Sequence, residues 1–179
     1  MSIYKNALLE FDHIFNNKSC RHSVNNDIYV LHCHHYTSLF TQLAIDSNEM
    51  FGGIKVLTES AEDSFNQFFN KYFIERPNLT LIEKISVAEQ YYSFAGLGKM
   101  IIKSLGEDSG EIVLESSHVD EGWIKKWGQY DKPINFITCG FISALFSSVF
   151  NKKTRTYCVR EEESIVCGSP VSKFIVYIK

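Results

Sequence analysis

The chain lacks the short motifs that mark the commonest nucleotide-dependent and hydrolytic enzymes. Neither Gly52-Gly53 nor Gly96-Leu97-Gly98 fits a phosphate-binding loop or a dinucleotide fingerprint. No Gly-x-Ser-x-Gly turn is present to carry a nucleophilic serine, and no His-Glu-x-x-His pair to hold zinc. These absences argue against a nucleotide-binding enzyme, a serine hydrolase of that type and a zinc peptidase.

Positive charge is also scarce. The 18 Lys and Arg residues are outnumbered by 21 Asp and Glu residues, which leaves a net charge of −3. Such a chain creates no basic field to attract a phosphate backbone. We therefore expect no nucleic-acid partner.

Disulfide spacing and an export signal are missing as well. The five cysteines are an odd number and contain no Cys-x-x-Cys pair, which is typical of reduced thiols in a cytoplasmic protein. The chain starts Met1-Ser2-Ile3 and continues without a secretory apolar core. Residues 133–150 are uncharged, but they carry polar side chains such as Asn135 and barely reach spanning length. We interpret this stretch as a buried helix and expect no membrane span.

The chain has enough apolar and aromatic residues for one core. Its 179 residues are 45% hydrophobic and 22% charged, which favours a single domain over residues 1–179. The 14 Phe, 9 Tyr and 2 Trp residues suit a large core and also suit a pocket for flat apolar ligands.

Residues 1–95 are expected to form a helical half that is integral to the domain. Residues 12–27 are polar and turn-rich, which predicts an exposed loop or a short hairpin, and residues 28–31 favour an extended segment. Leu39, Phe40 and Leu43 then fit one face of a short helix.

A long amphipathic helix is predicted over residues 54–73. Its apolar positions recur at three- and four-residue steps: Ile54, Leu57, Ala61, Phe65, Phe68 and Tyr72. Pro77 ends it, because proline cannot continue the helical hydrogen bonds.

The next helix begins with Thr80 and Glu83, which have the form of a capping box. The residues expected on its buried face are Ile82, Ile85, Ala88 and Tyr92.

The C-terminal half predicts two hairpin strands, 99–105 and 111–117, followed by a helix over 120–127. The buried helix 133–150 comes next, with Pro133 suited to its first turn. Two more strands are expected over 157–166 and 173–178. Helices first and strands later favour an α+β fold with a four-stranded antiparallel sheet in the C-terminal half.

Two segments of this half carry a resemblance to a known family. The first runs from His118 through Trp123 and Trp127 to Phe136, and the second is Cys167-Gly168-Ser169-Pro170-Val171-Ser172-Lys173-Phe174. Their order and spacing resemble the 4-vinyl reductase domain over about residues 96–178. This small-molecule-binding module occurs in a bacteriochlorophyll biosynthesis protein, in archaeal proteins and in the sensory part of phenol- and toluene-responsive transcription activators. The resemblance implies helices packed on a small antiparallel sheet, as also in subunits of the vesicle-tethering transport particle.

The resemblance also implies a zinc site that this chain has largely lost. Zinc-binding members use one Cys, one Glu and two further Cys, and alignment on Gly168 and Phe174 places these at Asn135, Glu161, Ser164 and Ser172. Asn and Ser bind zinc poorly, so we expect no cofactor and no metal at these degenerate positions. Zinc held by the displaced thiols Cys139, Cys158 and Cys167 is the alternative.

Ligand-binding residues follow from the same resemblance. A pocket between the buried helix, the sheet and the tryptophan-containing helix is expected to be lined by Trp123, Trp127 and Phe141, with Tyr36 and His32 from the N-terminal half. A place in the packed core is the alternative for each aromatic residue.

The densest group of chemically active side chains is His32-Cys33-His34-His35. If this segment is extended, His32 and His34 share one face and Cys33 takes the other. His32, Cys33 and His35 are therefore candidate catalytic residues, for acid–base work, metal binding or a thiolate nucleophile. A strand-to-helix junction without chemistry is the competing interpretation.

The sequence thus favours a protein that binds a small apolar or aromatic molecule rather than an enzyme, acting as a sensor or accessory protein. Because we see no effector domain, we expect it to act through a partner protein. A homodimer is expected from the wide aromatic face of helix 54–73. Two alternatives stay open: an enzyme that uses the His-Cys cluster, and a structural assembly subunit similar to vesicle-tethering transport-particle proteins.

Overall fold

The N-terminal half combines a small sheet with four helices. The computed structural model describes residues 11–179, so the expected lack of a secretory segment falls on residues outside that range. The sheet has the order β1-β2-β3, formed by His13–Asn16, Arg21–Val24 and Asp27–Tyr29. The helices are α1 (His34–Asp46), α2 (Asn48–Phe51), α3 (Gly53–Glu75) and α4 (Leu81–Phe94).

The C-terminal half contains the predicted antiparallel sheet, which confirms the α+β class. Its order is β4-β5-β7-β6. Its elements are β4 (Gly98–Leu105), β5 (Ser109–Ser117), α5 (His118–Trp127), α6 (Phe136–Val149), β6 (Tyr157–Glu163), the short 3-10 turn η1 (Ile165–Cys167) and β7 (Ser172–Ile178). All three strand pairs are antiparallel.

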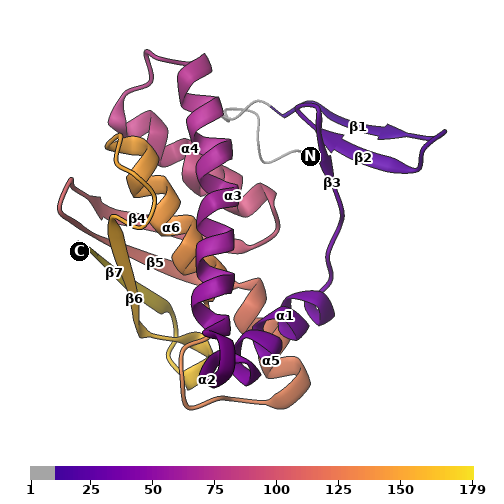
Figure 1. The fold of residues 1–179 in the computed structure, drawn as a ribbon, viewed down its shortest axis with the longest axis vertical. Helices are drawn as coiled ribbons and strands as arrows, with labels where there is room; N and C mark the ends of the chain where they lie inside the picture. Colours follow the sequence, from indigo (N-terminus) through magenta and orange to yellow (C-terminus); the bar gives the residue numbers. More distant parts are fainter. Residues whose placement is uncertain (1–10) are drawn as a thin grey trace.

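The core forms around α6, which lies between α3 and the four-stranded sheet (Figure 1). Eleven of its 14 residues are buried, as the uncharged sequence predicts. Gly140 lets α3 approach closely, because a Cβ there would lie only 2.4 Å from the carbonyl oxygen of Thr58. On the other side of α6, Phe146 packs edge-on against Tyr157 of β6.

The N-terminal sheet stands away from this core and is attached to α3 and α4 (Figure 1). The Tyr29 hydroxyl lies 3.1 Å from the Tyr91 hydroxyl, and the Lys71 ammonium lies 3.4 Å from the Asp27 carboxylate. The polar segment 12–27 therefore forms a hairpin of β1 and β2 rather than a loop, and β3 joins it as a third strand.

Local sequence patterns correctly predicted where most of the helices begin and end. Helix α3 stops at Glu75 before Arg76-Pro77, and both hydrogen bonds of the Thr80–Glu83 capping box are present at the start of α4. One boundary prediction is wrong. Helix α6 begins at Phe136, so Pro133 precedes the helix instead of occupying its first turn.

The predicted buried faces are less accurate. Ile82 is 78% exposed, because α4 turns Val87, Ala88, Tyr91 and Tyr92 inward. Leu43 of α1 is 53% exposed, since α1 buries the face that carries Thr37, Ser38, Thr41 and Ala44.

The aromatic face of α3 is covered by the chain itself. Phe69 and Tyr72 are buried, and the Phe68 ring stacks on Tyr91 with the ring centroids 3.7 Å apart. This aromatic face therefore does not need a second subunit to cover it, and the expected homodimer stays a prediction without support from this face. None of the helices within residues 11–179 combines the length and apolar character needed to cross a bilayer.

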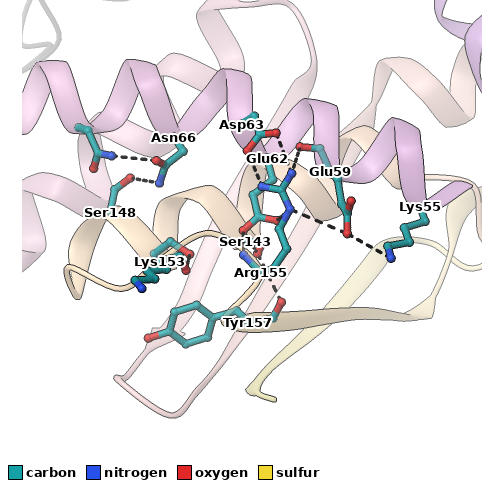
Figure 2. Close-up of polar contacts among 12 residues, drawn as sticks. Lys55, Glu59, Glu62, Asp63, Asn66, Ser143, Ser148, Lys153, Arg155 and Tyr157 are labelled. Atoms are coloured by element: carbon teal, nitrogen blue, oxygen red, sulfur yellow. Dashed lines mark hydrogen bonds and ion pairs between the residues drawn. The ribbon is translucent and has the colours of Figure 1, made fainter.

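A buried carboxylate fastens the loop after α6 to α3 (Figure 2). Glu62 is 3% exposed, and its Oε1 accepts the Ser143 hydroxyl at 2.9 Å and the Arg155 backbone N–H at 2.7 Å. Arg155 adopts a left-handed φ of 69° to present that N–H. Its guanidinium forms a two-bond ion pair with Asp63, which holds the pKa of Asp63 below its ordinary value.

Replacement of Glu62 by Ala should therefore destabilise the protein by about 2–4 kcal/mol, because it leaves buried donors unpaired. Asp63→Ala removes an ion pair from the same arginine, but the Asp63 side chain is 54% exposed. That change should cost less than about 1 kcal/mol because solvent screens exposed pairs. Urea unfolding of the two variants measures the difference. Equal losses would mean that the Glu62 contacts do not hold the loop.

Candidate functional site

The four positions aligned with zinc ligands converge at one place in the fold. Asn135 is the N-cap of α6, Glu161 lies near the end of β6, Ser164 follows that strand and Ser172 begins β7. Asn135, Ser164 and Ser172 are buried. These residues are up to 37 positions apart in the sequence. The pairing of β6 with β7 brings the strand ends together, and hydrogen bonds to Glu161 join the start of α6 to them.

Asp120 of α5 occupies the centre of this group and is fully buried. Its Oδ1 accepts the backbone N–H of Val166 at 3.1 Å and the Ser164 hydroxyl at 3.3 Å. Its Oδ2 accepts the Asn135 amide at 2.8 Å and the Ser172 hydroxyl at 3.4 Å. Four donors thus compensate the burial of one carboxylate.

The Asn135 side chain bridges two carboxylates. Its Nδ2 donates to Asp120 and also, at 2.7 Å, to Glu161 Oε1, while its backbone N–H donates to Glu161 Oε2 at 3.2 Å. The Ser117 hydroxyl donates to Asn135 Oδ1 at 2.9 Å and fixes the orientation of the amide. A neutral amide therefore separates two acidic groups, which a cation would otherwise do.

Burial raises the pKa of Glu161 above its ordinary value of 4.5, and the nearby Asp120 charge adds to this effect. Hydrogen bonds from Ser164 and Asn135 act in the opposite direction. Within residues 11–179, no three His, Cys, Asp or Glu side chains come together closely enough to hold a metal ion.

Two of the three displaced thiols are partly withdrawn from solvent. Burial, followed by the charge of Glu161, raises the pKa of both Cys139 and Cys167, which favours the neutral thiol at each. All five cysteines lie in the described part of the chain and are free thiols.

A second feature is a large open pocket of about 730 Å³ between the N-terminal sheet and the helices. It is contacted by the strands and linker before α1, by α1, α3 and α4, and by the segment before β4. Its apolar lining consists of Val24, Val30, Leu31, Phe40, Phe65, Phe94, Ala95, Leu97 and Ile137. The pocket has the size and apolar character of small-molecule sites.

Polar groups lie at a few points of this lining. They are His13, His22, Tyr29, His32, Thr37, Tyr91 and His118. Burial raises the pKa of Tyr91, whose hydroxyl is paired with that of Tyr29. Tyr91 therefore stays neutral, and the paired hydroxyls serve as hydrogen-bonding groups beside the apolar wall.

Of the five residues expected to bind ligand, the structure places His32 in this lining. Phe141 is buried in the main core, where Phe65 and Phe69 pack edge-on against its ring. Trp123 belongs to a smaller core with Val119, Ile134 and Val166, and Trp127 stacks on its edge as a half-exposed residue. Tyr36 is exposed and contacts the His32 ring, with the centroids 5.4 Å apart.

The His-Cys cluster is divided between two pockets because α1 begins at His34. His32 faces the large pocket, whereas Cys33, His34 and His35 line a separate recess. Cys33 Sγ lies 3.7 Å from His35 Nδ1. Within residues 11–179, no carboxylate hydrogen-bonds to Cys33 or His35, so no acidic group orients the imidazole for base catalysis.

The fold can now be compared with known proteins. No protein-family model and no curated protein matches the sequence. The phenol-responsive sensory domain of the transcription activator PoxR, solved with phenol, matches with a TM-score of 0.74 and 14% identity over 93% of this chain and 84% of that one. A vinyl-4-reductase family protein from Methanocaldococcus jannaschii matches with a TM-score of 0.56 and 16% identity over 84% of each chain. The chain has a 4-vinyl reductase-like fold.

A third structure with this fold comes from a different setting. It is trafficking protein particle complex subunit 3 from Naegleria fowleri, covalently bound to palmitic acid, with a TM-score of 0.54 and 10% identity over 82% of this chain and 94% of that one. At these identities the likenesses establish the fold alone. They agree with the resemblance that the C-terminal motifs carry.

Sequence reasoning missed the central role of Asp120 and most of the pocket lining. Asp120 was expected only as an acidic residue at the positive end of a helix, which it also is. No local signal distinguishes an exposed helix-start aspartate from one that accepts four buried hydrogen bonds. Phe65 and Tyr91 carried a weak signal, since both lie on helices rich in aromatic residues.

If the 4-vinyl reductase-like fold kept the geometry of a metal site, restored thiols should recover zinc. The triple variant Asn135→Cys, Ser164→Cys, Ser172→Cys, with Glu161 retained, offers three sulfurs and one carboxylate, which is a complete zinc ligand set. We expect one zinc per chain in the variant, measured by native mass spectrometry and by elemental analysis. The parent protein and Ser164→Cys alone are the controls. A triple variant that folds and takes up no zinc would contradict the assignment of the four positions.

Proposed function

We propose that this protein binds a small apolar or aromatic molecule in the pocket beneath the N-terminal sheet. The observation that carries the proposal is the pocket itself, about 730 Å³ with an aromatic and aliphatic lining and a few polar groups. Sites for small molecules usually have this combination, in which the apolar wall supplies affinity and the polar groups orient the ligand.

The exposed apolar side chains support the same conclusion. Val30, Leu31, Phe40 and Phe94 are all exposed although each lines the pocket. Apolar surface of this kind usually marks a binding site, because its burial is favourable by roughly 25 cal/mol per Å². An occupant of the pocket would cover all four.

The relatives in fold point in the same direction. The PoxR domain was solved with phenol, and the trafficking particle subunit carries palmitic acid, so both of these proteins hold an apolar molecule. His32 and His118 supply polar groups to the pocket of this chain. The two imidazoles can hydrogen-bond to the hydroxyl of a phenol or to a similar substituent.

We further propose that the protein works without zinc, as a sensor or accessory protein in the cytoplasm that acts through a partner protein. The hydrogen bonds around Asp120 support this, because Asn135 already separates the two acidic groups there. A homodimer remains part of the proposal. The exposed Leu39 and Leu43 of α1 are better placed for it than the covered face of α3.

An enzyme is the second candidate, favoured by the contact between Cys33 and His35. A histidine beside a cysteine can promote the reactive thiolate. The two residues line a recess different from the large pocket, which places them away from the proposed ligand. An assembly subunit is the third candidate, supported by the likeness in fold to the trafficking particle subunit.

Filling the pocket should abolish binding. Ile137→Trp adds a large side chain to the lining, and Ile82→Trp makes the same change at a position in α4 that is 78% exposed and outside the pocket. We expect Ile137→Trp to weaken binding of phenol and indole by at least about tenfold, equivalent to 1.4 kcal/mol or more. Isothermal titration calorimetry measures both. Equal affinity in the two variants, or no binding of either probe to the parent protein, would refute the proposal.

A double replacement separates binding from catalysis. Cys33→Ala with His35→Ala should leave the affinity for phenol and indole within about threefold of the parent value, because neither side chain lines the large pocket. His32→Ala is the matched change within the lining and should weaken binding more. If the parent protein converts a bound probe, and the double variant binds the probe without converting it, the protein is an enzyme instead.

A further inference from the structure

A second recess of about 530 Å³ lies where α1 begins beside α5. The residues that line it are Cys33, His34, His35, Ser38, His118, Gly122, Lys125 and Lys126. No aspartate or glutamate of the described chain is among them, although the protein as a whole is acidic. The recess therefore collects cationic and hydrogen-bonding groups.

Ser38 is the most unusual residue in this recess. It is 1% exposed, and its hydroxyl is the buried side-chain oxygen without a hydrogen-bond partner within residues 11–179. Thr41 on the same helix donates its hydroxyl to the carbonyl of Thr37 at 2.8 Å, which is the usual arrangement. A buried hydroxyl left unpaired is costly, so its position beside a recess indicates a missing partner.

Gly122 of α5 lies close to that hydroxyl and to the start of α1, and its lack of a side chain leaves the hydroxyl uncovered. A Cβ at this position would lie 3.2 Å from Ser38 Oγ and 3.0 Å from Cβ of His34. Any larger side chain would cover the hydroxyl and crowd the start of α1.

The start of α1 adds donors to the recess. The helix has 13 residues, its N-cap Cys33 forms no side-chain capping bond with the described residues, and its first turn contains no acidic residue. The Tyr36 N–H already donates to the Cys33 carbonyl at 3.1 Å, which leaves the N–H groups of His34 and His35 without a partner inside the helix. These two N–H groups carry the positive end of the helix dipole. An anion at such a position is stabilised by both effects.

Two imidazoles and two lysine side chains lie around the same point. The rings of His34 and His118 lie with their centroids 4.2 Å apart, and Lys125 and Lys126 approach from the last turn of α5. Burial, followed by the neighbouring His34, lowers the pKa of His118, while Glu121 and a backbone hydrogen bond with Cys33 act in the opposite direction. The two lysines therefore supply the positive charge of the recess, and the imidazoles supply hydrogen-bonding groups.

We propose that this recess binds an oxyanion, a phosphate or carboxylate group that accepts hydrogen bonds from the Ser38 hydroxyl and the start of α1. Lys125 and Lys126 balance its charge, and Gly122 leaves it room. Because His118 also lines the apolar pocket, the oxyanion site adjoins that pocket. The proposal stands independently of the ligand proposed there.

The test is a titration of the full chain with inorganic phosphate at constant ionic strength, followed by nuclear magnetic resonance. We expect saturable shifts at the Gly122 amide and the His34 ring. Ser38→Ala should weaken phosphate binding by about tenfold, the order expected for a hydrogen bond to a charged group. Lys125→Ala with Lys126→Ala should weaken it by a similar factor, and Lys103→Ala on the exposed edge of β4 should not.

Parallel titrations with acetate and benzoate identify the source of the oxyanion. If phosphate is the anion that binds, the natural ligand carries a phosphate group. If acetate binds as tightly as phosphate, the ligand carries a carboxylate. If benzoate binds more tightly than acetate, that carboxylate is joined to an apolar body. Phenol affinity should not change in Ser38→Ala, which separates this site from the apolar pocket. The proposal is overturned if none of the three anions saturates, or if Ser38→Ala binds phosphate as the parent does and melts at a higher temperature.

Discussion

The buried carboxylate of Asp120 is the interaction on which the C-terminal half depends. Asp120 lies in the first turn of α5. Its carboxylate accepts hydrogen bonds from the start of α6, from the turn after β6 and from the first residue of β7. An unpaired charge at this depth would cost several kcal/mol, so the surrounding donors are a condition of the fold. Asn135 extends the same network to Glu161 and keeps the two acidic groups apart. Serine and asparagine thus perform, through hydrogen bonds, the cross-linking that a metal performs in a zinc site.

The two buried acids, Asp120 and Glu62, both lie in the part of the molecule built around α6 and the four-stranded sheet. Glu62 ties the loop after α6 to α3, and the aromatic core around Phe141 fills the space between α3 and the sheet. The N-terminal sheet is attached by fewer contacts, chiefly Tyr29 with Tyr91 and Asp27 with Lys71. The large pocket lies between this sheet and the helices.

His118 connects the two proposed binding regions. It is the residue at which β5 gives way to α5, one position after the Ser117 N-cap and two before Asp120. Its ring faces the apolar pocket on one side and the recess around Ser38 on the other. Its backbone N–H donates to the Leu97 carbonyl at 2.9 Å, which ties the start of α5 to the segment before β4.

Local sequence patterns determined the type and order of the elements, because their causes act within a few residues. The Thr80–Glu83 capping box, the stop at Pro77, the hairpin over residues 99–117 and the uncharged helix around residue 140 are all examples. Alignment of the C-terminal motifs also predicted that Asn135, Glu161, Ser164 and Ser172 meet at one place in the fold. Tertiary structure alone decided that Asp120 is their common partner, that Ile82 is exposed and that Phe141 belongs to the core. It also decided the pocket lining and the unpaired hydroxyl of Ser38, because these depend on contacts between segments far apart in the chain.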